Sequence, residues 1–163
     1  MPVATDLLTV SDTFDDFLPP EAQFESHPEW FALRDGVRVP RGNFALTNPE
    51  ARRAYLDAME AWLEAHPLVT TLGIWPEVTS VWCEESLALG AARSYALLWR
   101  AAAHAHPDRE FEILATGATL QPPAGHVPAN VRVRFRPGRD ASALQPIASQ
   151  PKTDAIARAW EAR

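Results

Sequence analysis

The chain has 163 residues, a length that predicts one domain over residues 1–163. Its net charge of −6 argues against nucleic acid or an anionic membrane as a partner, because both need a basic face. One cysteine excludes an internal disulfide and a cysteine-rich metal site, and no apolar run approaches the roughly 20 residues of a membrane span. The first residues show neither a basic leader nor a long apolar segment, which predicts a cytoplasmic protein.

The N-terminal part of the chain combines short elements with loops. Residues 7–10 form a short apolar run that predicts a strand. Residues 30–39 predict a β-hairpin, because Asp35 and Gly36 separate two extended runs and both accept the positive φ that a tight hairpin turn requires. Residues 43–46 predict another short strand.

The first long helix is predicted to begin at Asn48. Thr47 or Asn48 can cap it, Pro49 loses no hydrogen bond at the first position, and Glu50 suits the positive end of the helix dipole. Apolar residues then recur at spacings of three and four, so that one face of the helix is apolar. The histidine-proline step at His66 ends the helix.

The central strand of the predicted sheet follows this helix. Residues 69–75 are apolar and uncharged, which is typical of a parallel strand that is buried on both faces, and Pro76 ends the run. A second helix over about 91–106 also ends at a histidine-proline step and leads into an apolar strand over 111–115. This alternation of strand and helix predicts βα units and a parallel sheet.

The last predicted strand covers residues 131–135, where apolar residues alternate with Arg132 and Arg134, as in a half-exposed or edge strand. A helix follows from about Thr153. These five parallel-type strands are too few for a closed eight-stranded barrel, which takes roughly 250 residues. The chain is therefore an incomplete barrel, an open sheet or part of a longer polypeptide. Open sheet edges need cover, so a homo-oligomer or a larger barrel partner is a candidate to supply it.

Three stretches resemble a known family: FLPPEAQFESHPEWFALRDGVRV, FALTNPEARRAYLDAMEAWLEAHP and LGIWPEVTSVWCEE. They are similar to the bacterial domain-of-unknown-function family 4838, whose members look like glycoside hydrolase barrels of the α-glucuronidase and β-hexosaminidase type. The likeness covers about residues 12–135. The sequence departs from the family where only Cys83 stands for a cluster of three cysteines, and where residues 13–16 stand for a loop that often has histidine. The resemblance implies an α/β fold with a partial (β/α) TIM-barrel-like parallel sheet and an inserted hairpin, and it implies sugar chemistry.

The strongest catalytic candidate is Glu77, immediately after the central strand. Right-handed crossovers bring the carboxyl ends of all parallel strands to one rim, where chemistry collects in α/β sheets and barrels. The apolar surface of Trp75 can raise the pKa of the Glu77 carboxyl, as a general acid of glycoside cleavage requires. The acid of the resembled family falls at this position too. The alternative is a solvated loop glutamate next to a strand-ending proline.

Glycoside cleavage needs a second carboxylate, and two loops of the same rim supply candidates. Asp15 and Asp16 lie on one loop, and Glu84 and Glu85 lie on the other. Each pair also has a structural interpretation. The aspartates can cap the following turn, and the glutamates can begin the next helix, where acids are favourable.

Aromatic and polar residues of the rim are candidates for binding a sugar. Trp75 and Trp82 can present a platform to a sugar ring, and Asn48 and Glu84 can bind hydroxyls, although helix capping explains Asn48 better. The arginines over 132–139 can bind a sugar carboxylate or belong to an exposed strand face.

Two functions follow from these patterns. The first is a carbohydrate-active domain that hydrolyses or binds a glycan through carboxylates and tryptophans at the carboxyl ends of the strands. The alternative is a non-catalytic remnant of such a barrel that binds a glycan or a partner. We expect no cofactor and no metal, because phosphate-binding loops and metal-ligand motifs are missing from the sequence.

Overall fold

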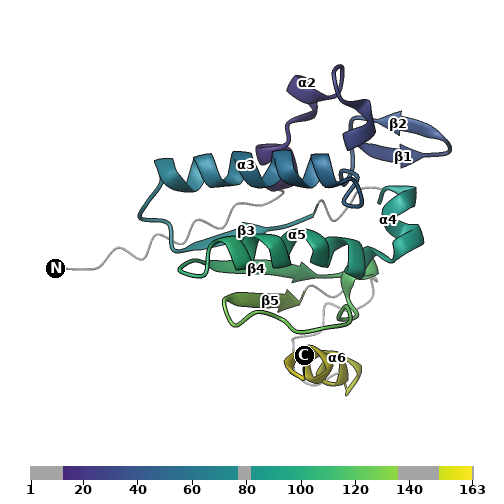
Figure 1. Ribbon diagram of the computed structural model, residues 1–163. Coiled ribbons are helices and arrows are strands. Elements are labelled where there is room, and N and C mark those ends of the chain that lie inside the picture. The colour runs from purple at the N-terminus through teal and green to yellow at the C-terminus, as the bar shows by residue number, and fades with distance from the viewer. Residues whose placement is uncertain (1–12, 77–81, 136–150, 163) are drawn as a thin grey trace, which may run out of the picture.

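The computed structural model describes residues 13–76, 82–135 and 151–162. It is a mixed α/β fold with a three-stranded parallel sheet and a two-stranded antiparallel hairpin (Figure 1). The elements in chain order are α1 (Thr13–Phe17), α2 (Pro20–Gln23), η1 (Pro28–Trp30), β1 (Ala32–Arg34), β2 (Val37–Val39), α3 (Pro49–Ala65), β3 (Thr71–Ile74), α4 (Glu84–Leu89), α5 (Ala91–Ala105), β4 (Glu110–Ala115), η2 (Gly117–Thr119), β5 (Val131–Phe135) and α6 (Pro151–Glu161).

The predicted hairpin is confirmed by β1 and β2. The two strands pair from Ala32 opposite Val39 to Arg34 opposite Val37. Asp35 and Gly36 form the turn with φ values of 51° and 73°, as the Asp-Gly signal requires. Each strand has only three residues, so the hairpin depends on contacts with the rest of the molecule.

The signals for the beginning and end of α3 are also confirmed. The Asn48 side chain accepts hydrogen bonds from the backbone N–H groups of Glu50 and Ala51, which satisfies two donors that have no partner within the helix. His66 is the C-cap of α3, and His106 occupies the same position in α5.

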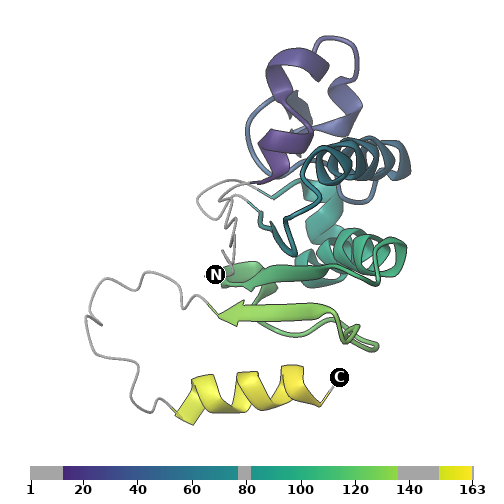
Figure 2. The same ribbon diagram turned by 90° about the vertical axis from the view of Figure 1, so that its left-hand side faces the viewer.

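The parallel sheet has the order β3-β4-β5, and its apolar face packs against helices. Leu72, Phe111 and Val131 stand in one row across the three strands, and all three are buried. Helices α3 and α5 both cover this face (Figures 1 and 2), and their apolar residues join those of the strands in one core. Helix α6 runs beside β5 in both views.

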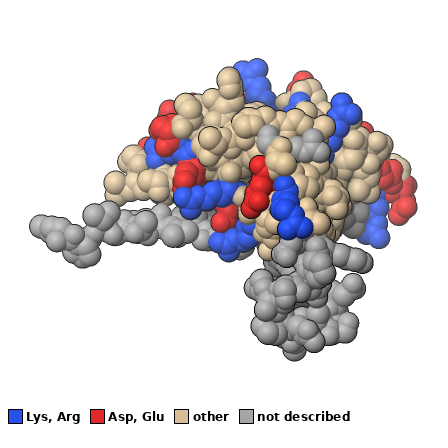
Figure 3. Space-filling model, turned by 90° about the horizontal axis from the view of Figure 1, so that it is seen from below, with Lys and Arg blue, Asp and Glu red and all other residues tan. Residues whose placement is uncertain are grey.

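The opposite face of the sheet carries charged residues arranged in two rows. Glu110 and Glu112 lie on β4, and Arg132 and Arg134 lie on β5. Arg132 forms an ion pair with Glu110 at 2.7 Å, and Arg134 forms one with Glu112 at 3.1 Å. The predicted alternation of β5 is therefore confirmed. Acidic and basic side chains are also interspersed over the side of the molecule seen in Figure 3.

Other parts of the prediction are wrong or untested. Residues 43–46 form a buried loop and not a strand. The N–H of Ala45 donates to the carbonyl of Trp30 and that of Leu46 to the carbonyl of Phe44, both at 2.8 Å. The predicted strand over 7–10 lies outside the described residues. Three parallel strands are described in place of five, and they form no closed barrel within the described part of the chain.

None of the helices in the described ranges has the length and apolar character needed to cross a membrane.

Candidate functional site

Several chain segments meet at the carboxyl end of the parallel sheet. Helix α3 precedes β3 in the chain and runs in the opposite direction (Figure 1), so α3 begins near the carboxyl end of the sheet. Helix α4 is the next element after β3. The β1–β2 hairpin lies beside these two helix starts (Figure 1) and contacts α4. The structure thus assembles polar side chains from three elements at the sheet edge where ligands of α/β proteins usually bind.

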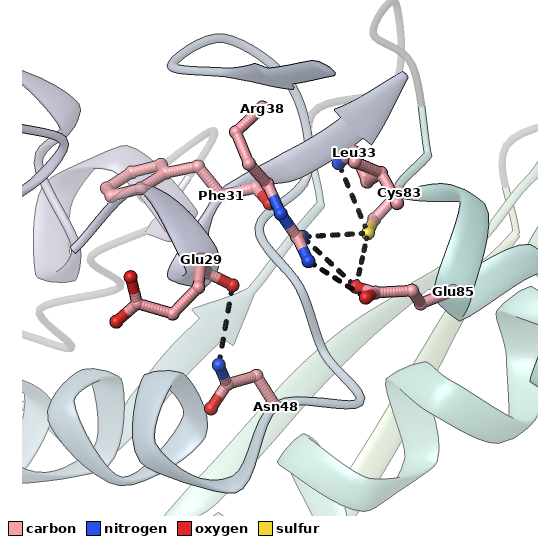
Figure 4. Close-up of polar contacts among 7 residues, drawn as sticks. All are labelled: Glu29, Phe31, Leu33, Arg38, Asn48, Cys83 and Glu85. Atoms are coloured by element: carbon pink, nitrogen blue, oxygen red, sulfur yellow. Dashed lines mark hydrogen bonds and ion pairs between the residues drawn. The ribbon is translucent and has the colours of Figure 1, made fainter. Parts of the chain in front are cut away.

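The hairpin is joined to α4 by a forked ion pair. Arg38 on β2 donates to both carboxylate oxygens of Glu85, at 2.8 Å and 3.0 Å. The same guanidinium donates to the backbone carbonyl of Phe31 at 2.9 Å (Figure 4). Such a fork fixes the orientation of both side chains, which a lysine at this position would not do.

Cys83 lies beneath this ion pair and is fully buried. Its sulfur accepts the backbone N–H of Leu33 at 3.3 Å, and its thiol donates to Glu85 at 3.3 Å (Figure 4). The side chain of Glu84, the next residue in the chain, accepts the backbone N–H of Asp35 in the hairpin turn. The first turn of α4 therefore holds both strands of the hairpin. Cys83 is therefore a buried residue that helps to hold the hairpin against α4.

The charges of the ion pair stabilise each other. The hydrogen bonds from Arg38 lower the pKa of the Glu85 carboxyl, and partial burial opposes this effect. The hydrogen bond to Glu85 raises the pKa of Arg38 in turn. Glu85 is therefore an anion at neutral pH and is not a proton donor.

An open pocket of about 360 Å³ lies beside the ion pair. Four segments line it, and its lining residues are Glu29, Arg38, Thr47, Asn48, Pro49, Glu50 and Glu85. Asn48 contributes twice, because its side-chain oxygen caps α3 while its nitrogen donates to the carbonyl of Glu29 at 3.3 Å (Figure 4). The volume of the pocket is in the range of small-molecule pockets, and the lining of the pocket is mainly polar.

A buried tyrosine links the two strands of the sheet that lead to this edge. The hydroxyl of Tyr95 on α5 donates to the carbonyl of Ile74, the last residue of β3. It accepts the backbone N–H of Leu114 on β4 at 3.2 Å. Burial raises the pKa of this phenol, so the hydroxyl keeps its proton and can make both bonds.

Trp75 lies just beyond β3, on the side of the charged sheet face. The guanidinium carbon of Arg134 stands 5.4 Å from the centroid of the Trp75 ring, within the range of a cation–π contact. Arg134 also forms the ion pair with Glu112 described above. Trp75, Arg134 and Glu112 therefore form one group that extends from the middle of β4 to the carboxyl end of β3, on the face that α3 and α5 leave uncovered.

The structure places the predicted site residues in several different positions. Glu77, the catalytic candidate, lies outside the described residues. Asp15 and Asp16 are exposed on α1. Trp82 is half-buried and packs against the core.

Three other predicted residues lie near the carboxyl end of the sheet, but they belong to two separate groups of contacts. Asn48 lines the pocket beside Glu85, whereas Trp75 belongs to the charged sheet face. Glu84 holds the hairpin turn. The sequence prediction of Glu84 and Glu85 as the start of a helix is confirmed by α4.

Sequence reasoning missed Arg38 and the hydroxyl of Tyr95. Arg38 is flanked by two valines, and Val37 is the exposed one, with 63% of its surface accessible. In this strand the valine points to solvent and the arginine points toward the protein, which is the reverse of the usual arrangement. The sequence does not show which face of the strand is buried, so it could not identify Arg38. Tyr95 fits the apolar face of its helix, and no local signal reports that its hydroxyl reaches two strands.

Comparison with known proteins identifies a family. A family model described as Domain of unknown function (DUF4838) matches residues 3–161. No curated protein matches the chain, and no solved structure does so either.

Proposed function

Since this chain belongs to the DUF4838 family, we propose that it is a carbohydrate-active domain built as part of a glycoside-hydrolase-like barrel. In this proposal a glycan binds at the carboxyl end of the sheet, on the face that carries Trp75 and the paired charges of β4 and β5.

The arrangement of the helices supports the barrel relationship. The strands are parallel and adjacent in chain order, and α3 and α5 lie on the same face of the sheet (Figure 2). A doubly wound sheet has helices on both faces, whereas a barrel has them only on its outer face. The charged face then corresponds to the inner side of a barrel. A second copy or a larger barrel partner that covers the open sheet edges belongs to the same proposal.

The observation that carries the proposal is the group formed by Trp75, Arg134 and Glu112. An indole ring offers an apolar surface against which the face of a sugar ring can pack. Carboxylate and guanidinium groups beside it can accept and donate hydrogen bonds to sugar hydroxyls. Trp75 lies at the strand end where barrel enzymes hold their substrates, and Arg134 and Glu112 adjoin it on the same face.

The hydrolytic form of the proposal assigns the proton donor to Glu77. Asp15 or Asp16 then supplies the second carboxylate. If the domain is a hydrolase, Glu77→Gln removes turnover of a glycan that the protein still binds, because the amide keeps the shape of the side chain and cannot transfer the proton. Unchanged turnover in this variant rejects the assignment.

Titration with a panel of mono- and oligosaccharides, followed by tryptophan fluorescence, tests the binding function. We expect a saturable change that is lost in Trp75→Phe. Trp62→Phe is the matched control, because Trp62 stacks on His66 at the opposite end of α3, with ring centroids 4.1 Å apart. A cooperatively folded protein that responds to none of the sugars contradicts the proposal, and so does an equal loss in both variants.

One observation favours the non-catalytic alternative. The two carboxylates that the structure describes on the charged face, Glu110 and Glu112, are both paired with arginines. An arginine stabilises the ionised form of a carboxyl and opposes its use as a general acid. Saturable binding without turnover of any sugar in the panel, in the unmodified protein, identifies this alternative.

A further inference from the structure

The described part of the chain contains a continuous series of hydrogen bonds between the hairpin and the carboxyl end of β3. We propose that Arg38 and Tyr95 are positioning residues, which through this series hold Trp75 in place although neither is expected to touch a glycan. The consequence for glycan binding rests on the proposed function, whereas the coupling itself can be measured without a sugar.

The first step joins the hairpin to α4. The fork from Arg38 to Glu85 fixes β2, and the bonds to Cys83 and Glu84 fix β1 and the turn. These contacts all end in the first residues of a helix that is only six residues long. Because so short a helix has little stability of its own, its position depends on its contacts with the hairpin and with α5.

The second step joins α4 to α5. The Ser94 hydroxyl donates to the carbonyl of Ser86 at 2.9 Å, and both residues are fully buried. Gly90 connects the two helices directly with a φ of 99°. A displacement of α4 therefore acts on the first turn of α5 through a buried bond with no water available to replace it.

The third step joins α5 to the strands. Tyr95 follows Ser94 in the chain, so the two helical residues move together. The Tyr95 hydroxyl holds the carbonyl of Ile74, and Trp75 is the next residue. The same hydroxyl holds the N–H of Leu114 on β4, which fixes the spacing of β3 and β4 at this point.

Each step has two partners that lie far apart in the sequence or in different elements, which makes the series testable by pairs of substitutions. A hairpin that only packed on the surface of the protein would not need to be connected to the sheet by these hydrogen bonds. If the hairpin only covered the pocket beside α3, its loss would leave the carboxyl ends of β3 and β4 unchanged.

Nuclear magnetic resonance of the 15N-labelled protein tests the coupling. The reporters are the indole signal of Trp75, assigned by its absence in Trp75→Phe, and the amide signal of Leu114. We expect Arg38→Lys and Glu85→Gln each to shift both reporters, because each variant breaks the fork and keeps the size of the side chain. The matched control is Asp57→Asn, which removes the exposed ion pair between Arg53 and Asp57 on α3 (3.7 Å) and should shift neither reporter.

A second substitution tests the route. In a Ser94→Ala background, the shifts that Glu85→Gln causes at Trp75 and Leu114 should be greatly reduced, while those at the hairpin amide of Leu33 stay. Tyr95→Phe should act in the same way. If Tyr95→Phe does not fold, the Ser94→Ala pair still decides the question.

The outcomes separate this proposal from the proposed function. Shifts confined to the hairpin overturn the coupling, whatever the sugar titration shows. If a sugar from the panel binds, Arg38→Lys should weaken its affinity roughly 2- to 30-fold, the range of coupling through connected residues. Equal affinity in the wild type and Arg38→Lys overturns the positioning role even if the signals move. Failure of every sugar to bind rejects the proposed function and leaves the spectroscopic result to stand.

Discussion

The hydroxyl of Tyr95 lies between two neighbouring strands and accepts the backbone N–H of Leu114 at 3.2 Å. The pairing of β3 with β4 ends at Ile74 and Ile113, whereas β4 continues to Ala115. The hydroxyl therefore adds a side-chain bridge between the two strands at the point where their direct pairing ends.

Removal of this hydroxyl should destabilise the protein more than its size suggests. Tyr95→Phe keeps the ring in the core but removes the hydrogen bonds of the hydroxyl to Ile74 and Leu114, which together should contribute about 1–3 kcal/mol. Urea unfolding measures the free energy of unfolding, and an unchanged denaturant slope shows that the fold is retained. A loss below about 0.5 kcal/mol would mean that these backbone groups find other partners.

The cap of α3 makes a second prediction. Asn48→Ala removes the oxygen that accepts from Glu50 and Ala51 and should cost about 0.5–2 kcal/mol of unfolding free energy. Asn48→Asp is the matched control, because it keeps the capping oxygen and replaces the donor to the Glu29 carbonyl with an anionic oxygen. Equal destabilisation in both variants, measured by thermal unfolding, would assign the effect to Glu29 and not to the cap.

The two ion pairs of the charged sheet face should differ in strength. The side chain of Glu112 is 16% exposed, whereas that of Glu110 is 42% exposed. A double-mutant cycle to alanine should give the pair of Glu110 and Arg132 a coupling energy of about 0–1 kcal/mol, which 1 M salt largely screens. The pair of Glu112 and Arg134 should give the larger coupling and the weaker salt dependence. The reverse order would contradict the burial argument.

Glu85 should give the stability of the protein a pH dependence in the acid range. Hydrogen bonds from Arg38 lower its pKa in the folded state, so the unfolded state takes up the proton first as the pH falls. The stabilisation is therefore complete above the ordinary glutamate pKa, near about 4.3, and is lost at lower pH. The stability difference between the wild type and Glu85→Gln should be constant near neutral pH and shrink on acidification. A difference that stays constant down to pH 3 would contradict this assignment.

The sequence predicted the elements whose signals are local. The Asp35-Gly36 turn defines its own hairpin, and the segment around Asn48 carries within three residues all that a helix start requires. The apolar runs likewise located β3, β4 and β5. These signals depend on backbone preferences and on period, so they survive without knowledge of the tertiary structure.

The features that the sequence did not predict depend on contacts between distant segments. Residues 43–46 are buried by tertiary packing, and burial alone gives the same apolar run as a strand. Arg38 and Glu85 are separated by 47 positions, and no pattern in either segment selects the other. The same reason explains why two of the predicted residues, Asn48 and Trp75, lie in different groups. Asn48 and Trp75 both lie near strand ends. Asn48 caps α3 on the helix-covered face of the sheet, whereas Trp75 contacts Arg134 on the charged face.

Cys83 gives the hairpin a built-in reporter of its own opening. It is the single cysteine of the chain, and the hairpin and the forked ion pair bury it completely. A thiol reagent can reach the sulfur only when these contacts separate, so the rate of labelling measures how often the unmodified protein exposes this region. Local opening and global unfolding then become distinguishable by their dependence on denaturant, because opening of the hairpin alone exposes far less surface.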